Sequence, residues 1–474
     1  MIDLQSQGRY RLDLLSFPIV GAILRWKHNR TAAQFVLFGL AAAIIVDGFW
    51  GSPLAAKNVA TVSAWVHYRG LVVLGLLVAG NLFCAACPFV LPRKLAKWLG
   101  RPTQRWPRAL RNKWLALAGF VGIIYTYELF DLWASPWWTA WLTLAYFATA
   151  FVLEAFFTRN SFCKYVCPLG TFNFLYSTVS PLQISARSQQ TCRDCKGHEC
   201  INGSPSQQGC QLELFVPTLK SNLDCTFCLD CVKACPYDNV ALVARPPGDE
   251  LFRQTWPHRL DLAYLSLLAA FVGLINAVAM TPPIYDLERQ MAAWLGTRNE
   301  ALVLGIIYLV AAIGLPLGAA YSAAWLSNRW NHNGDSLNRL VMRYAYSFVP
   351  LGLAIWLAHY LFHFVTGAMT IVPAFQTLFA DTLGIPLLGE PDWSIALWFV
   401  PSTGSIQITQ LVVMAVGTLV SVHMTMRAAH GANPRWRGFW LEALPWLVLL
   451  FLLAAAGANT FTLPMEMRGS AIGG

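Results

Sequence analysis

Long apolar blocks constrain this chain more than any other feature of its sequence. Nine blocks, separated by short charged connections, each reach the roughly 20 residues that a helix needs to cross a bilayer. They cover residues 33–52, 66–90, 114–134, 137–158, 259–281, 300–326, 344–368, 406–427 and 438–460. Over the whole chain, 56% of the residues are hydrophobic and only 12% are charged. The blocks are continuously apolar, and none shows the polar face of a soluble helix. The sequence therefore predicts an all-α polytopic protein in a lipid bilayer.

The basic residues indicate how the chain is oriented. The connection after the second block holds eight Lys and Arg residues between Arg93 and Lys113 and no acidic residue, whereas the flanking connections hold only Lys57. By the positive-inside rule this connection is cytoplasmic. We expect a bacterial inner-membrane protein with a cytoplasmic N-terminus and, after nine spans, a periplasmic C-terminus. The same uneven distribution explains the net charge of +10 without a nucleic-acid partner.

Composition divides the chain into four regions. Residues 1–32 are a cytoplasmic or interfacial segment, in which residues 12–24 suit an interfacial helix better than a cleaved signal. Residues 33–167 form a four-helix membrane bundle, and residues 259–474 form a five-helix C-terminal bundle. Between them, residues 168–258 are rich in Ser, Gln, Asp and Gly, which indicates a polar cytoplasmic insert.

All twelve cysteines lie between Cys84 and Cys235, on the side predicted to face the reducing cytoplasm. Disulfides are rare there, so metal or redox chemistry is expected. The run from Cys225 to Pro236 matches the bacterial ferredoxin pattern C-x2-C-x2-C-x3-C-P. In that pattern three thiolates bind one cubane and the fourth binds a neighbouring cluster. A structural zinc site is the less favoured interpretation.

A second cysteine set supplies the ligands of the neighbouring cluster, although its spacing is wider and Gln211 replaces the usual proline. We predict a ferredoxin-like α+β module with two [4Fe–4S] clusters, and a [3Fe–4S] form of the first stays open. The predicted ligands are Cys192, Cys195, Cys200 and Cys235 for the first cluster, and Cys210, Cys225, Cys228 and Cys231 for the second.

The remaining cysteines form two pairs near the inner ends of the second and fourth blocks. Cys84 and Cys87 precede Pro88, and Cys163 and Cys167 precede Pro168. On a helix, separations of three and four residues place both thiols on one face, and proline marks where the helix ends. Four such sulfurs side by side would suit a third cluster, a reversible dithiol or a soft copper site. Small buried hydrophobic side chains are the structural alternative.

These motifs give the chain a family resemblance over about residues 30–245. It resembles the membrane polyferredoxins that include NosR, NapH and CcoG, which combine paired membrane C-x3-C-P motifs with a two-cluster ferredoxin module. The Cys163 motif matches fully, and the Cys84 motif is one residue short. The resemblance implies electron transfer through iron–sulfur clusters. It does not extend to the C-terminal bundle.

Three histidines in the apolar blocks are further candidates for metal ligands. His359 and His363 share one face of the seventh predicted span, and His67 is predicted at a similar depth in the second. Ionisable residues within a membrane are functional candidates. Haem, copper, a quinone head group and plain hydrogen bonding between helices all stay open for them.

The predicted function is electron transfer between the cytoplasmic clusters and a quinone or a periplasmic redox protein, so the chain would be an oxidoreductase component. Two alternatives stay open. One is a copper-reducing protein for cuproenzyme maturation, and the other is a transporter or redox sensor that the clusters regulate.

Overall fold

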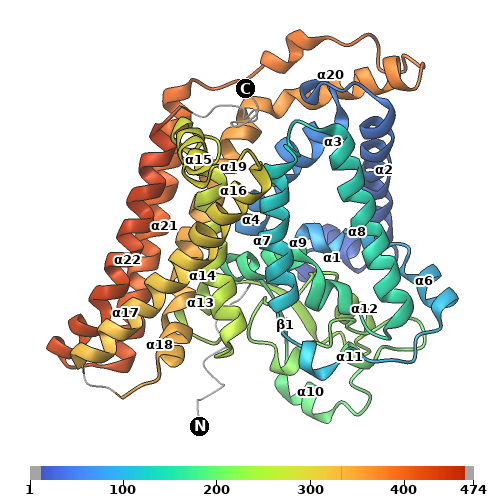
Figure 1. Cartoon of the computed structure of the whole chain (residues 1–474). Helices are drawn as coiled ribbons and strands as arrows, with labels where there is room; N and C mark the ends of the chain where they lie inside the picture. Colours follow the sequence, from blue (N-terminus) through green and yellow to red (C-terminus); the bar gives the residue numbers. More distant parts are fainter. Residues whose placement is uncertain (1–11, 332–333, 465–474) are drawn as a thin grey trace. The chain divides into compact units, whose positions relative to one another are not determined.

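The computed structural model describes residues 12–331 and 334–464, and nearly all of its regular elements are helices (Figure 1). The first eleven and last ten residues, and hence the predicted chain ends, lie outside the described residues. The chain divides into two compact units. Unit 1 comprises Met1–Leu40, Gly75–Arg111 and Tyr146–Trp256, and unit 2 comprises Ala41–Leu74, Asn112–Ala145 and Pro257–Gly474. The four predicted regions stay predictions.

The predicted all-α polytopic fold is confirmed. Within the described residues, eight helical runs are long and apolar enough to cross a membrane, and α7, Trp114–Leu129, is a shorter ninth. The eight runs are α2 Asn29–Trp50, α3 to α4 Val59–Val78, α8 Pro136–Phe156, α14 Leu260–Val278, α16 to α17 Glu300–Asn331, α18 to α20 Leu337–Thr382, α21 Thr403–Ala432 and α22 Trp436–Thr462. Each corresponds to one apolar block of the sequence.

The second of these runs ends earlier than the sequence predicts. Its helix stops at Val78 instead of continuing to residue 90. Gly80 has a φ of +84°, and a Cβ there would lie 2.9 Å from Ser180 Oγ, so the backbone turns where only glycine fits well. Asn81 then caps a separate short helix, α5, Leu82–Ala85. Hydropathy could not show this turn because Leu82, Phe83 and Cys84 keep the sequence apolar.

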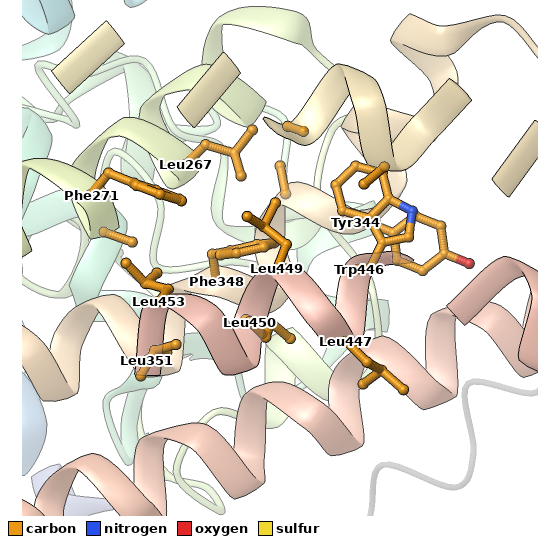
Figure 2. Packing of buried hydrophobic residues seen from close by; sticks show 14 of the residues in the cluster. Leu267, Phe271, Tyr344, Phe348, Leu351, Trp446, Leu447, Leu449, Leu450 and Leu453 are labelled. Atoms are coloured by element: carbon orange, nitrogen blue, oxygen red, sulfur yellow. The ribbon is translucent and has the colours of Figure 1, made fainter. Parts of the chain in front are cut away.

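Unit 2 has a continuous apolar core in which α14, α17, α19 (Phe348–Gly367), α21 and α22 pack together. Figure 2 shows its aromatic centre, where the rings of Tyr344 and Trp446 stack with centroids 4.8 Å apart. One carboxylate lies inside this core. Glu442 accepts hydrogen bonds of 2.9 Å from both Arg343 Nη1 and the Tyr344 hydroxyl. A buried charge is tolerated when it is paired and hydrogen-bonded in this way.

Unit 1 contains the polar insert, whose only described sheet is small. Strands β1, Leu182–Ala186, and β2, Val240–Ala244, pair antiparallel, with Ile184 opposite Leu242. Short helices connect them: α10 Gln189–Asp194, α11 Glu199–Asn202 and α12 Asp230–Ala234. Their core includes Ile184, Val216, Phe227 and Leu242. The predicted α+β module is therefore two strands with helical turns between them.

The N-terminal segment belongs partly to this core. Residues 12–24 were expected to form an interfacial helix, but the helix α1 spans only Pro18–Arg25. Before it, Leu15 is 2% exposed within the core of the insert, and the Leu12 carbonyl accepts a hydrogen bond of 2.8 Å from Ala244 N. The segment thus extends the small sheet and covers one edge of it.

Four shorter helices connect the elements described above. They are α6 Arg93–Gly100, α9 Pro168–Tyr176, α13 Asp249–Phe252 and α15 Pro282–Leu295.

A buried ion pair fastens the end of the insert. Arg245 Nη1 lies 2.7 Å from Glu250 Oε2, and the two side chains are 0% and 2% exposed. The arginine also donates to the carbonyl oxygens of Ser180 and Thr178. Glu250 accepts from Ser221 Oγ and from the backbone N–H of Asn222. The pair thus joins the strand ends to the loop that precedes Cys225.

Replacing Glu250 with glutamine should destabilise the insert by about 3 kcal/mol, because Arg245 would keep a buried, uncompensated charge. Asp249→Asn is the matched control. It alters the neighbouring pair with Arg253, which is 48% exposed on the arginine side, and exposed pairs contribute at most about 1 kcal/mol. Thermal denaturation followed by visible cluster absorbance would measure both variants. Equal stability of the two would show that the buried pair is not a principal fastening.

Candidate metal centres

The first predicted cysteine set lines one cavity of unit 1. Cys192, Cys195, Cys200 and Cys235 surround it, together with His198, Phe215, Val216 and Asn239. Cys192 lies on α10 and Cys200 on α11, whereas Cys235 follows α12, so three separate helical turns bring the thiols together. The returning cysteine of the C-x3-C-P run therefore reaches the first set, as the ferredoxin pattern predicts.

The second predicted set lines a neighbouring cavity of the same unit. Cys210, Cys225, Cys228 and Cys231 surround it, with Ile184, Phe227 and Leu229. Val216 lines both cavities and is 3% exposed, so the two sites share one buried apolar side chain. The Cys210 N–H donates to the Cys200 carbonyl at 3.0 Å, which returns the intervening loop to the second cavity.

The thiols surround these cavities and do not converge on a point. Within the part of the chain that the structure describes, no three His, Cys, Asp or Glu side chains lie close enough to hold one metal ion. A zinc ion requires four sulfurs about 2.3 Å from one centre. Thiols arranged around a cavity fit the larger body of an iron–sulfur cubane better, and the residues present are consistent with two such groups.

Strained backbone gathers at these cysteines. Seven non-glycine residues of the insert adopt positive φ angles, and six of them lie within three positions of a cysteine: His198, Glu213, Asp224, Phe227, Leu229 and Asp238. Such conformations cost of order 1 kcal/mol or more each and persist where the surrounding structure requires them. They turn the chain tightly enough for several thiols of one loop to face the same cavity.

The sulfur atoms receive hydrogen bonds from the protein. Asn239 is the main donor at the first cavity, with its side-chain amide 3.2 Å from Cys192 Sγ and its backbone N–H 3.4 Å from Cys235 Sγ. At the second, Leu214 N–H lies 3.4 Å from Cys210 Sγ. Burial raises the pKa of the Cys200, Cys228 and Cys231 thiols above the ordinary value. Ionising them therefore needs the positive charge of bound metal.

The two remaining cysteine pairs also lie in unit 1, and all four side chains are less than 10% exposed. The sequence predicts them at the inner ends of two long helices, but the structure places them outside those helices. Cys84 lies on the short helix α5, and Cys163 lies in a π-helical turn, Phe162–Val166, which α8 does not reach. Cys167 interacts electrostatically with Cys84, Cys87 and Cys163. The structure thus brings the two pairs into one group, although each turn is separate from its span.

The two pairs share a local design that sequence analysis missed. Asn81 accepts a hydrogen bond from Cys84 N–H at 3.3 Å, and Asn160 accepts one from Cys163 N–H at 3.1 Å. The repeated pattern Asn-x-Phe-Cys was visible in the sequence. Asn81 also donates to the Cys225 carbonyl at 3.2 Å, which links the Cys84 turn directly to the second cavity.

Arg30 is a second link that the sequence did not reveal. Its Nη1 lies 2.7 Å from Asp230 Oδ2, next to the cysteines of the second cavity. The same guanidinium interacts electrostatically with Cys228 in that cavity and with Cys87 and Cys163 in the paired group. One partly buried cation therefore acts on both sets of thiols.

The candidate histidines separate into two places within unit 2. The ring nitrogens of His67 lie 3.0 Å and 2.9 Å from the carbonyl oxygens of Val62 and Ala368, so the fold already occupies both. His359 and His363 come together, with their Nε2 atoms 3.1 Å apart. Met280 Sδ lies 3.4 Å from His359 Nε2. No sequence signal marked this methionine, which is 79 residues away from His359.

A cavity of about 350 Å³ adjoins His363 in unit 2. Its lining is mostly aromatic and apolar, with Arg69, His363 and three threonines as its polar members. The Arg69 guanidinium lies over the rings of Trp65 at 4.5 Å and Tyr127 at 4.1 Å. A π-helical turn, Val62–Tyr68, precedes Arg69 and carries Trp65 to the cavity. The arginine is 7% exposed and interacts electrostatically with Tyr127 and with the carboxylate of Glu128. A buried, desolvated donor of this kind can hold a polar ligand group.

Comparison with known proteins agrees with this chemistry. A family described as a 4Fe-4S binding domain matches residues 64–107 and 139–180, which contain Cys84, Cys87, Cys163 and Cys167. YccM of Escherichia coli, provisionally named an electron transport protein, is 32% identical over 147 residues. The methylamine utilization ferredoxin-type protein MauN of Paracoccus denitrificans is 25% identical over 225 residues. The predicted likeness to membrane polyferredoxins is confirmed.

The similarity covers only parts of this polyferredoxin-like chain. The match with YccM spans 30% of this chain and 39% of YccM, and the match with MauN spans 44% of this chain and 74% of MauN. No solved structure matches the chain. The chain thus shares iron–sulfur motifs with these proteins, and its own partners have to be inferred from its structure.

Cys228→Ser should remove the low-temperature EPR signal of one cluster and leave the other, because each cavity has its own set of four cysteines. Cys192→Ser should remove the other signal. Iron in the isolated protein should fall by about four atoms in each case. Loss of both signals from either variant would contradict the assignment of separate ligand sets.

Proposed function

We propose that this protein passes single electrons through two [4Fe–4S] clusters, bound by the eight cysteines of the insert, to or from a redox partner at the bacterial inner membrane. The observation that carries the proposal is the pair of four-cysteine cavities that share Val216. Electron transfer needs sites that are close and dry. A buried valine that lines both cavities supports both requirements.

A bound cluster supplies the one-electron chemistry, and the chain tunes it. Asn239 and Leu214 donate hydrogen bonds to ligand sulfurs, which stabilise the more negative, reduced state. Ile184, Phe227 and Leu229 exclude water from the second cavity. Burial works in the opposite direction from the hydrogen bonds, because it disfavours added negative charge. The balance between these effects sets the potential of each site.

The paired cysteines are proposed to form a third redox site on the same route. Asn81 joins the Cys84 turn to the Cys225 carbonyl, so a continuous chain of bonds and hydrogen bonds connects this site with the second cavity. The match of a 4Fe-4S binding family to both turns favours a cluster there over a dithiol or copper. Electrons would pass from the insert toward the membrane helices, or in the reverse direction, through these turns.

The partner on the membrane side is proposed to be a quinone. The cavity beside Arg69 supports this choice, because it combines aromatic walls for a flat ring with a buried guanidinium that can donate to a carbonyl oxygen. A periplasmic redox protein is the other partner that the predicted orientation allows. Quinone binding to the isolated protein distinguishes them.

The paired cysteines offer the sharpest test of the route. Cys84→Ala or Cys163→Ala should abolish electron transfer in membranes while the two insert clusters still assemble, because their ligands lie elsewhere. Ser161→Ala is a matched control, since Ser161 is a buried neighbour of Cys163 without a thiol. A third cluster would bring the intact protein to about twelve iron atoms instead of about eight. Full activity in the double cysteine variant would exclude this site from the route.

The proposed orientation has its own test. A membrane-impermeant thiol reagent should label none of the twelve cysteines in intact spheroplasts and should label some after lysis and cluster removal, because the basic connection predicts that they face the cytoplasm. Labelling from outside would show that the predicted orientation is wrong. It would not contradict the assignment of the cysteine ligands.

A further inference from the structure

Three soft or borderline metal donors converge within unit 2, far along the sequence from any cysteine. His359 Nε2 lies 3.1 Å from His363 Nε2 and 3.4 Å from Met280 Sδ. His359 is fully buried, and its other ring nitrogen, Nδ1, has no hydrogen-bond partner among the described residues. Local hydrogen bonds therefore compensate little for burying this imidazole.

Hydrogen bonding alone does not explain why two groups face the same nitrogen. In a neutral imidazole each ring nitrogen offers either one hydrogen or one lone pair in the ring plane. His359 Nε2 can thus make one good hydrogen bond, with either His363 or Met280. The other of these two groups then lies next to His359 Nε2 without a hydrogen bond to it.

A bound ion accounts for all three contacts. Histidine nitrogens lie about 2.0–2.1 Å from a metal such as zinc, and sulfur lies about 2.3 Å away, so donors around one ion stand roughly 3.0–3.6 Å apart. The two observed separations, 3.1 Å and 3.4 Å, fall in this range. The spacing of four between His359 and His363 on α19 places both rings on one helical face, where both can bind one ion.

The donor set indicates which metal would bind. Thioether sulfur selects copper(I) over harder ions, and imidazole also suits copper. All three donors are neutral, and Arg69 lines the same cavity as His363 and Met280. A monovalent ion costs less than a divalent one in such low-dielectric surroundings beside a cation. The cavity also gives the ion a path to these donors.

We propose that Met280, His359 and His363 bind one copper(I) ion. The site belongs to the C-terminal bundle, which the polyferredoxin resemblance does not cover, and it does not depend on the iron–sulfur clusters. The family match ends at residue 180, before all three donors.

The test uses the full-length, cluster-loaded protein in detergent under anaerobic conditions. One equivalent of copper(I) is added, and X-ray absorption at the copper edge identifies the bound atoms. We expect two nitrogens and one sulfur. In His363→Gln and in Met280→Leu, affinity against a chromophoric copper(I) chelator should fall at least tenfold. His67→Gln is the matched control, since its ring nitrogens contact backbone carbonyls, and it should bind as the unmodified protein does.

The cysteines also bind copper(I), so the ligand atoms decide the outcome. Copper bound through sulfur alone, or unchanged affinity in both His363→Gln and Met280→Leu, would overturn the proposal. Iron content and cluster EPR signals should stay normal in these variants. Normal values would indicate that the variants still fold and bind their clusters. A failure of the electron-transfer proposal would instead appear in those iron signals and leave copper binding intact.

Discussion

The buried pair of Arg245 and Glu250 connects the small sheet of the insert to the loop that begins the cysteine run. A two-stranded sheet with short helices buries too little surface to hold its loops by hydrophobic contact alone. The ion pair and its hydrogen bonds connect parts of the insert that are distant in the sequence. Arg245 binds the carbonyl oxygens before β1, and Glu250 holds Ser221 and Asn222. Asn222 in turn donates to the carbonyl oxygens of Ser177 and Leu182. The start of the cysteine run is thereby fixed to the sheet by charge and hydrogen bonds.

This fastening explains how strained cysteine loops can persist. Residues such as Phe227 and Leu229 hold positive φ angles on both sides of Cys228, and such strain must be offset by the surrounding structure. Cluster binding would supply part of the compensation, because metal binding and folding are coupled. The polar network around Asn222 holds the base of the loop through protein contacts alone. A loop held there and bound to metal at its centre would have few alternatives to the curled conformation.

The sequence predicted the features that are set locally, and it missed those set by contacts between distant residues. Continuous apolarity identified every long helix, and ferredoxin spacing identified which cysteines share a cavity, since both patterns are carried by neighbouring residues. Hydropathy did not reveal the end of a helix at Val78, because that turn depends on Gly80 meeting Ser180 and Phe227. Spacing could not bring Met280 to His359 either. The hydrogen bonds from Cys84 N–H to Asn81 and from Cys163 N–H to Asn160 were predictable in principle, as the same four-residue pattern occurs twice.

Arg30 suggests how the chain balances charge along the proposed route. Each electron that arrives adds a negative charge to a buried site, which is unfavourable in a low dielectric. The Arg30 guanidinium interacts with Cys228 on one side and with Cys87 and Cys163 on the other, so it favours the reduced state at both places. Its ion pair with Asp230, at 2.7 Å, keeps the guanidinium in position and partly offsets its charge. Because one fixed cation acts on both sites, an electron moving between them loses less stabilisation than it would on leaving a site with its own separate cation.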